Sequence, residues 1–99
     1  MFLLDTSTLL LLRVRNKCFP YAYLTTSKVI NELALKSTSI EQSGPCFLII
    51  GFTSKKIRTA DEEIYLLKKL CPNLEVITQD YHLRKKTKGT SVKKLLINY

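Results

Sequence analysis

Residues 75–86 read EVITQDYHLRKK, a stretch in which an apolar run meets a single acid and then a cluster of bases. The run at residues 74–78 predicts a strand, and residues 80–89 predict a short helix that Gly89 stops. Asp80 therefore stands at the carboxyl end of a predicted strand. The rest of the chain shows a similar alternation of strands and helices.

The first part of the chain carries one predicted strand and two predicted helices. Residues 2–5 form a short apolar run that predicts a strand, and residues 6–14 contain no Gly or Pro and predict a helix. Residues 15–24 are interpreted as a connection, and residues 25–37 predict the second helix. Its candidate caps are Thr25, Thr26 and Ser27, and its expected apolar face is Val29, Ile30, Leu33 and Leu35.

The middle and the end of the chain continue the alternation after a break at residues 41–45, EQSGP. Residues 46–52, CFLIIGF, are apolar throughout and predict a strand buried on both faces. Residues 59–70 begin with a Thr-x-x-Glu capping pattern and predict a helix, and residues 91–98, SVKKLLIN, predict a final strand. The expected inward stripe of the 59–70 helix is Ile64, Leu67 and Leu70.

This order of elements indicates an α/β fold. Continuous apolar strands that alternate with helices are typical of a parallel sheet with right-handed crossovers. A chain of 99 residues has room for one core, and no linker or repeat interrupts it, so we expect a single domain over residues 1–99. In such sheets, sites form at the carboxyl ends of the strands.

The composition favours a polyanionic partner. Sixteen Lys and Arg against eight Asp and Glu give a net charge of +8, which attracts nucleic acid more readily than a membrane surface. Three widely spaced cysteines predict neither a disulfide framework nor a zinc finger. No stretch approaches the roughly 20 apolar residues of a membrane helix. We therefore expect a soluble, cytoplasmic protein.

Four of the eight acids stand where a parallel sheet would bring them together. Asp5 and Asp80 follow predicted strands, Glu32 lies in the second helix, and Asp61 lies in the first turn of the 59–70 helix. Taken singly, three of them also have a structural interpretation. Asp80 could be a helix cap, Asp61 a favourable charge at a helix N-terminus, and Glu32 a solvated helix position. A charge within the apolar N-terminal run is costly unless it is paired or metal-bound, so Asp5 is the strongest candidate.

Clustered carboxylates in a basic chain suggest a divalent cation. Mutual repulsion raises the cost of gathering them, and hard oxygen ligands suit Mg²⁺ or Mn²⁺ better than zinc. Flanking bases would then hold phosphates of the substrate. The candidate phosphate-binding residues are Lys55, Lys56, Arg58, His82, Arg84, Lys85, Lys86 and Lys88. As the single histidine, His82 is expected to contact phosphate or solvent rather than to act as a catalyst.

The order of these motifs resembles that of PIN-domain nucleases. The segment FLLDTSTLL resembles the first motif of that family, with Asp5 as its acid and Ser7 at its polar position. The segments SKVINELALKS, IRTADEEIYLLKKL and VITQDYHLRK resemble the next three motifs, at Glu32, Asp61 and Asp80. The resemblance covers nearly the whole chain, roughly residues 2 to 96, and the last two motifs are the most specific.

The resemblance implies a fold, an activity and a cofactor. The fold would be a small three-layer α/β/α sandwich with a central parallel sheet, and the activity a metal-dependent endonucleolytic cleavage, usually of RNA. We expect single-stranded regions of RNA as the partner. The implied ligands of Mg²⁺ or Mn²⁺, which are also the catalytic residues, are Asp5, Glu32, Asp61 and Asp80. Ser7 and Thr78 would support them through hydrogen bonds.

The branch that the last motif resembles most acts in small-subunit ribosomal RNA maturation, so a role in RNA processing with a ribosome-assembly partner is one interpretation. A second is the toxin of a toxin–antitoxin pair, which would have an antitoxin partner and, in many relatives, a homodimer surface. A third is a non-catalytic module that binds RNA or the ribosome through a degenerate acidic site. The chain alone does not choose between these roles.

Overall fold

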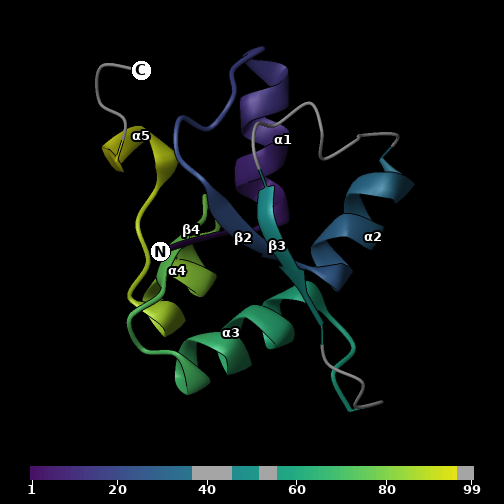
Figure 1. The fold of residues 1–99 in the computed structure, drawn as a ribbon, viewed down its shortest axis with the longest axis vertical. Coiled ribbons are helices and arrows are strands. Elements are labelled where there is room, and N and C mark those ends of the chain that lie inside the picture. Colours follow the sequence, from purple (N-terminus) through teal and green to yellow (C-terminus); the bar gives the residue numbers. More distant parts are fainter. Residues whose placement is uncertain (37–45, 52–55, 96–99) are drawn as a thin grey trace.

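The computed structural model describes residues 1–36, 46–51 and 56–95, which form an α/β fold (Figure 1). The strands are β1 (Phe2–Leu4), β2 (Tyr23–Thr26), β3 (Cys46–Ile50) and β4 (Glu75–Ile77). The helices are α1 (Thr6–Val14), α2 (Ser27–Leu35), α3 (Ala60–Leu70), α4 (Tyr81–Thr87) and α5 (Val92–Leu95). The predicted break at residues 41–45 lies outside the described residues.

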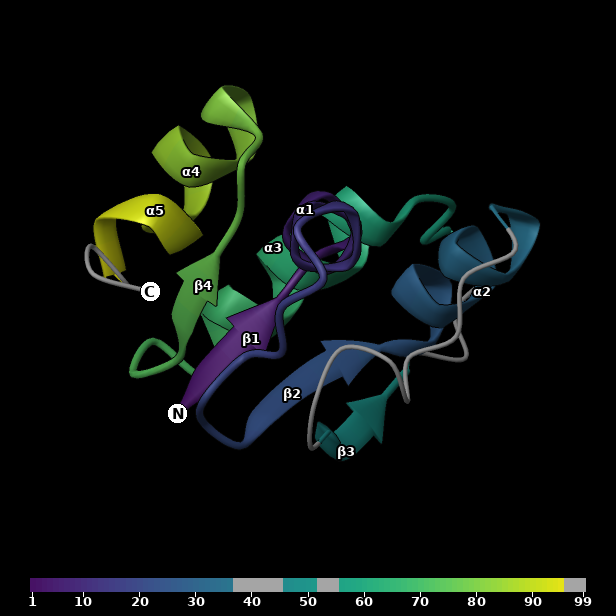
Figure 2. The ribbon, with the colours of Figure 1, turned by 90° about the horizontal axis from the view of Figure 1, so that it is seen from above.

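The four strands form one parallel sheet in the order β3-β2-β1-β4. Phe2 pairs with both Tyr23 and Glu75, so β1 lies at the centre with its last residue beside that of β4. The helices flank the sheet, with α1 packed against α2, α2 against α3, and α3 against α4 (Figure 2). The predicted α/β class with a central parallel sheet is confirmed, and its carboxyl edge is where β1 and β4 both end.

Strand β2 falls where the sequence predicted a connection and a cap. All four of its side chains are buried, and they include two threonines, whose β-branched side chains suit a strand. Thr26 ends the strand and caps α2 as well, because its hydroxyl accepts from the Val29 N–H at 3.2 Å. The cap prediction is therefore correct for Thr26, and the prediction of a connection through residue 24 is wrong.

The predicted final strand at residues 91–98 is also wrong in the part that the structure describes. Only Thr90 pairs with β4, through hydrogen bonds with Val76 and Thr78, and the chain then turns into α5. The Ser91 hydroxyl accepts from the Lys94 N–H at 3.2 Å, a bond that starts a helical turn in place of a strand. Residues 96–98 lie outside the described residues.

Two leucines that were expected inside are on the surface. Leu35 is 86% exposed and Leu70 is 68% exposed, because both stand at the last residue of their helix, beyond the turns that face the sheet. The buried stripe of α3 is instead Ala60, Glu63, Ile64 and Leu67. A carboxylic side chain thus occupies a position of the apolar face, which bears on the site below.

Helix α4 ends at Thr87, two residues before the predicted glycine. Lys88 adopts the left-handed conformation, with φ 52°, and forms the C-cap. Gly89 is needed for a different reason: a Cβ there would lie 2.6 Å from the Val76 carbonyl oxygen of β4. The close approach of this turn to β4 lets the chain return along the sheet at Thr90.

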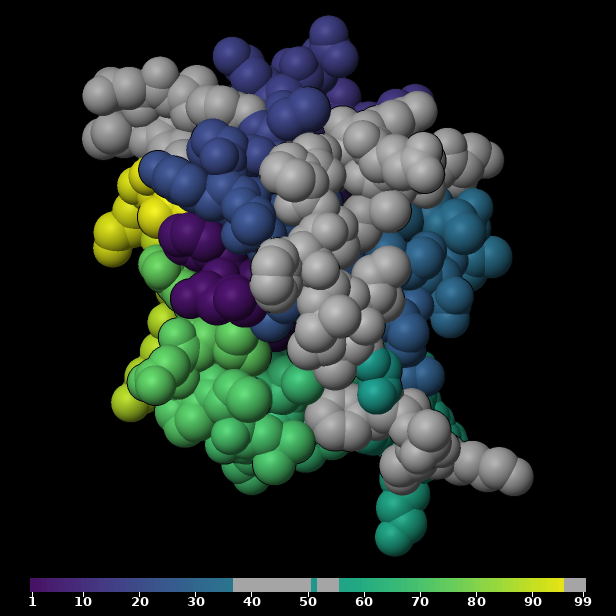
Figure 3. All heavy atoms as spheres, in the orientation of Figure 1, coloured from purple at the N-terminus to yellow at the C-terminus, as the bar shows by residue number. Residues whose placement is uncertain are grey.

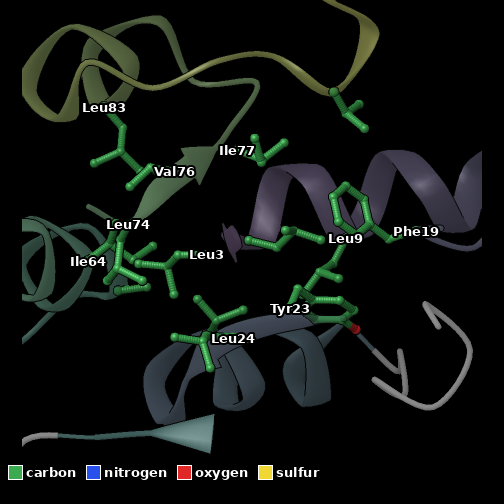
Figure 4. Packing of buried hydrophobic residues seen from close by; sticks show 14 of the residues in the cluster. Leu3, Leu9, Phe19, Tyr23, Leu24, Ile64, Leu74, Val76, Ile77 and Leu83 are labelled. Carbon is green, nitrogen blue, oxygen red and sulfur yellow. The ribbon is translucent and has the colours of Figure 1, made fainter. Parts of the chain in front are cut away.

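The core fills the space between the sheet and the helices (Figure 4). Leu3 of β1 and Val76 of β4 are fully buried, and Leu3 lies beside Ile64 of α3 and Val76 beside Leu83 of α4. The start of the chain is held against the turn after α3, because the Glu75 N–H donates to the Met1 carbonyl at 2.9 Å, and these parts touch in Figure 3. This bond fixes the amino end of β1 against that of β4.

Candidate metal and nucleic-acid site

Asp5 follows β1 directly and is buried, with 4% of its surface exposed. It is the N-cap of α1, since its Oδ1 accepts from the Thr8 N–H at 3.0 Å. The hydroxyl of Ser7 donates to Oδ1 at 2.8 Å, and that of Thr78 donates to Oδ2 at 2.5 Å. Burial raises the pKa of Asp5, and these hydrogen bonds act in the opposite direction.

Asp80 is joined to Asp5 through a short chain of hydrogen bonds. The Thr78 hydroxyl that donates to Asp5 also accepts from the Asp80 N–H at 3.0 Å. Asp80 caps α4, with its Oδ1 accepting from the N–H groups of His82 and Leu83 at 2.9 and 3.2 Å. One carboxylate oxygen of Asp80 is therefore committed to the helix, and the other has no such role in capping.

Glu32 approaches the same edge from α2. Its Oε2 accepts from the Thr6 hydroxyl at 2.5 Å, and Thr6 is the residue immediately after Asp5. Sequence interpretation did not single out Thr6, because a threonine at the first position of a helix has no distinctive pattern. The contact places the Glu32 carboxyl beside the start of α1, next to the acid that ends β1.

Asp61 lies in the exposed first turn of α3 and interacts electrostatically with all three other acids. Its pKa is raised first by partial burial and then by repulsion from Asp80, Asp5 and Glu32, whereas Lys86 lowers it. The four predicted acids thus share one region of electrostatic repulsion. Across residues 1–36, 46–51 and 56–95, however, no three His, Cys, Asp or Glu side chains form a group that could hold a metal ion in this conformation.

Glu63 is a fifth acid at this edge, one that the sequence analysis missed. Its side chain is fully buried, and its Oε1 accepts from the Lys28 N–H at 3.1 Å. Its Oε2 accepts from the Ser27 hydroxyl at 3.4 Å. Glu63 therefore fixes the first turn of α2 against α3, which are the helices that carry Glu32 and Asp61. Its signal was available: it lies three residues after Ala60 and four before Leu67, on the apolar stripe.

The predicted phosphate-binding bases are mostly on the surface. His82, Lys85, Lys86 and Lys88 of α4 and its cap are exposed, as are Lys56 and Arg58, whereas Arg84 is half-buried. Lys85 lies with its Nζ 5.1 Å from the Tyr81 ring centre, and Lys86 neighbours Asp61 closely enough to lower its pKa. Lys55 lies outside the described residues. A base in the last turn of α4, Lys86, therefore lies near an acid in the first turn of α3, Asp61.

Comparison with solved structures shows a likeness to a PilT N-terminus domain protein from the hyperthermophilic archaeon Sulfolobus solfataricus. The two chains are 18% identical with a TM-score of 0.70, and the match covers 98% of this chain and 92% of that one. No family model matches this chain, nor does any curated protein. No helix among the described residues is long and apolar enough to cross a membrane. The fold of this chain is that of a PilT N-terminus, or PIN, domain.

Proposed function

We propose that the protein is a Mg²⁺- or Mn²⁺-dependent endoribonuclease of the cytoplasm. PIN domains are generally metal-dependent nucleases, and the fold of this chain is theirs. The observation that carries the proposal is the set of hydrogen bonds that joins Asp5 to Asp80 through Thr78 and holds Glu32 on Thr6, next to Asp5. The raised pKa of Asp61, whose causes include these three acids, agrees with it. Four acids from four separate elements repel one another at the carboxyl edge of the sheet, where α/β folds place their sites.

The residues present fit a hard divalent cation in their chemistry. Carboxylate oxygens are the ligands that Mg²⁺ and Mn²⁺ prefer, and the proposed holders are Asp5, Glu32, Asp61 and Asp80. A bound cation would offset their repulsion and stabilise the negative charge that develops on the phosphate during cleavage. Ser7 and Thr78 orient the Asp5 carboxylate through their hydroxyl groups.

The proposed reaction is hydrolysis of a phosphodiester bond. Water adds to phosphorus while the bond from phosphorus to the 3′ oxygen breaks, which leaves a 5′ phosphate and a 3′ hydroxyl. Exposed bases such as Lys85 and Lys86 hold neighbouring phosphates, and Lys86 stands beside Asp61. The chain's own contribution is therefore to position the substrate phosphate next to the acids and to hold the acids in place.

The test is cleavage of end-labelled single-stranded and structured RNA with Mn²⁺, Mg²⁺ or chelator. Asp5→Asn and Asp80→Asn should abolish chelator-sensitive cutting. Glu75→Gln is the matched control, because Glu75 is an exposed acid at the opposite end of β4 and should cut like the natural protein. RNA that is bound but never cut, by any of these proteins, would refute the nuclease and favour the non-catalytic module.

A second readout is independent of turnover. A cation that binds the folded chain raises its melting temperature by mass action. Mn²⁺ should therefore stabilise the natural protein and the Glu75→Gln variant, and stabilise Asp5→Asn and Asp80→Asn less. Equal stabilisation of all four proteins would place the cation elsewhere.

A further inference from the structure

Two adjoining hollows lie along the junction of α3 and α4. The first, of about 260 Å³, has among its lining residues Asp61, His82, Tyr65 and Lys86. The second, of about 360 Å³, is lined by Tyr65 and Lys86 again, together with Lys68, Lys69, Pro72, Thr87 and Lys88. Because they share two residues, the hollows adjoin, and the first has an acid of the candidate site in its lining. The two hollows together are called the groove below.

The charge along this groove changes sign. Both helices begin near the acids, with Asp61 in the first turn of α3 and Asp80 capping α4. Both helices end in bases. Those that line the groove include Lys69 of α3, Lys86 of α4 and Lys88, the residue that caps the C-terminus of α4. From Asp61 to Lys69 the helix rises by roughly 12 Å, at 1.5 Å per residue. The basic part therefore begins beside Asp61, at Lys86, and extends away from the acids to Lys69 and Lys88.

Tyr65 is the point where the two helices' bases meet. Lys69 Nζ lies 5.1 Å from the centre of its ring, and Lys86 Nζ lies 6.0 Å from it. Lys68 is different, because its ammonium donates to the carbonyls of Pro72 and Leu74 and is used to close the turn after α3. Among the residues that the structure describes, neither Lys69 nor Lys86 has a salt bridge to a carboxylate.

The helix dipole explains lysines in the last turn of each helix, taken one at a time. It does not explain why lysines from two different helices gather around one aromatic ring, where their charges repel each other. A phosphate between the two ammonium groups would remove that repulsion. Interleaved aromatic and cationic groups along a groove are the arrangement that binds single-stranded nucleic acid, with the ring as a platform for a base.

We propose that this groove binds a single-stranded segment of RNA beside the phosphate that is cut, with Lys69, Lys86 and Lys88 on its phosphates and Tyr65 stacked on a base. The proposal rests on the proposed nuclease function and names how that site holds its substrate. Tyr65 and Lys69, on α3, lie outside the bases that the sequence singled out. The groove gives the substrate one path, from the bases toward Asp61.

Binding of a fluorescent single-stranded oligoribonucleotide in chelator, where no cutting is expected, tests the groove by itself. The double variant Lys69→Gln/Lys86→Gln should bind at least tenfold more weakly at low salt. Its slope of log affinity against log salt should fall by about 1.4, at about 0.7 per lost phosphate contact. The matched control is Lys93→Gln/Lys94→Gln, which removes the same charge from exposed positions on α5 and should change affinity less than twofold.

The aromatic platform has its own pair of variants. Tyr65→Leu should weaken binding about tenfold, whereas Tyr65→Phe should retain it, because stacking needs the ring and not the hydroxyl. Tyr21→Leu is the control, since Tyr21 is 49% exposed and stacks on Phe2 before β2. Circular dichroism of each variant verifies that α3 remains folded.

The outcomes separate this proposal from the nuclease itself. Weakened binding in the groove variants, with no cutting by the natural protein, would support the groove and refute the nuclease. Cutting by the natural protein, with groove variants that bind and cut as well as it does, would refute the groove alone. Equal losses in the Lys69→Gln/Lys86→Gln and Lys93→Gln/Lys94→Gln variants would mean that net charge alone causes the effect. Preferential binding of anionic lipid vesicles over RNA would also overturn the proposal.

Discussion

The two sides of the acidic edge are built in different ways. On the strand side, Asp5 and Asp80 follow neighbouring strands, and Ser7 and Thr78 join them in a continuous set of hydrogen bonds. On the helix side, Glu32 and Asp61 stand on α2 and α3, and their relative position depends on a contact made elsewhere, by Glu63. The strand side is set by the sheet, and the helix side by how two helices pack.

The largest expected effect is on the helix side. Glu63→Ala removes the acceptor of the Lys28 N–H, leaves a cavity in the core, and should lower the free energy of unfolding by about 3 kcal/mol. Because α2 then loses its anchor on α3, cleavage should also fall. Urea denaturation and RNA cleavage measure the two effects. Glu62→Ala, at the exposed neighbouring position, should lower stability and cleavage far less. Equal losses in the two variants would mean that Glu63 has no special role.

The strand side is tested by Thr78→Val. The change keeps the shape but deletes the donor to Asp5 and the acceptor of the Asp80 N–H, and it should cost about 2 kcal/mol of unfolding free energy. Cleavage should fall by about 10- to 100-fold, the usual range for groups that orient a metal ligand.

Its control separates stability from orientation. Thr25→Val deletes another buried hydroxyl, which donates to the Leu4 carbonyl at 2.8 Å, and no acid is involved. It should lower stability to a similar degree and leave cleavage largely unchanged at a temperature where the protein is folded. A parallel loss of activity in both variants would mean that Thr78 acts through stability alone.

This difference between the two sides also decides what the sequence reveals. The strand-side acids follow apolar runs, so their place at the carboxyl edge follows from the rule for parallel sheets and from the N-cap chemistry of Asp. The position of Asp61 in the first turn of α3 follows in the same way from the cap at Thr59. Local chemistry is enough for these residues because each role is fixed within a few positions.

The features that sequence reasoning missed depend on contacts between distant segments. The strand β2 is read as a cap and a loop because its threonines satisfy partners outside the strand: Thr25 bonds to β1 and Thr26 caps α2. Glu63 accepts from partners 35 and 36 residues away, the Lys28 N–H and the Ser27 hydroxyl, and such bonds offset the cost of burying it. The end of the chain turned helical after a single pairing at Thr90, which no periodicity indicates.

A smaller perturbation of the helix side comes from Gly51, just after β3. A Cβ at this position would lie 2.5 Å from the Ser27 hydroxyl oxygen, which itself donates to Glu63. Gly51→Ala should therefore force that hydroxyl aside and cost about 1 kcal/mol. In a Ser27→Ala background the same change should cost less, because the hydroxyl is gone. Additive costs in this double-mutant cycle, measured in urea, would contradict the contact.

The smallest expected effect is an increase in the free energy of unfolding, whereas the changes above lower it. It concerns the repulsion between the acids on the two sides of the edge. The N-terminus of α3 favours a charge on Asp61, but three other acids and partial burial oppose it, and its raised pKa shows that the opposition is stronger. A raised carboxyl pKa means that ionisation costs the folded state stability. The cost is absent below the ordinary value of 3.8 and grows as the pH rises through the raised pKa.

Asp61→Asn should therefore be more stable than the natural protein in chelator, by about 0.5 kcal/mol at neutral pH, as for other exposed charge interactions, and equally stable at low pH. Urea denaturation at a series of pH values measures this difference. Glu62→Gln removes a charge from the same helical turn but also turns the acceptor of the Arg58 N–H from a carboxylate into a neutral amide oxygen, which weakens that bond, so it should lower stability. An Asp61→Asn variant that is less stable at neutral pH would mean that the helix dipole outweighs the acids. The two sides of the edge would then be independent, and the case for a shared cation would lose its electrostatic support.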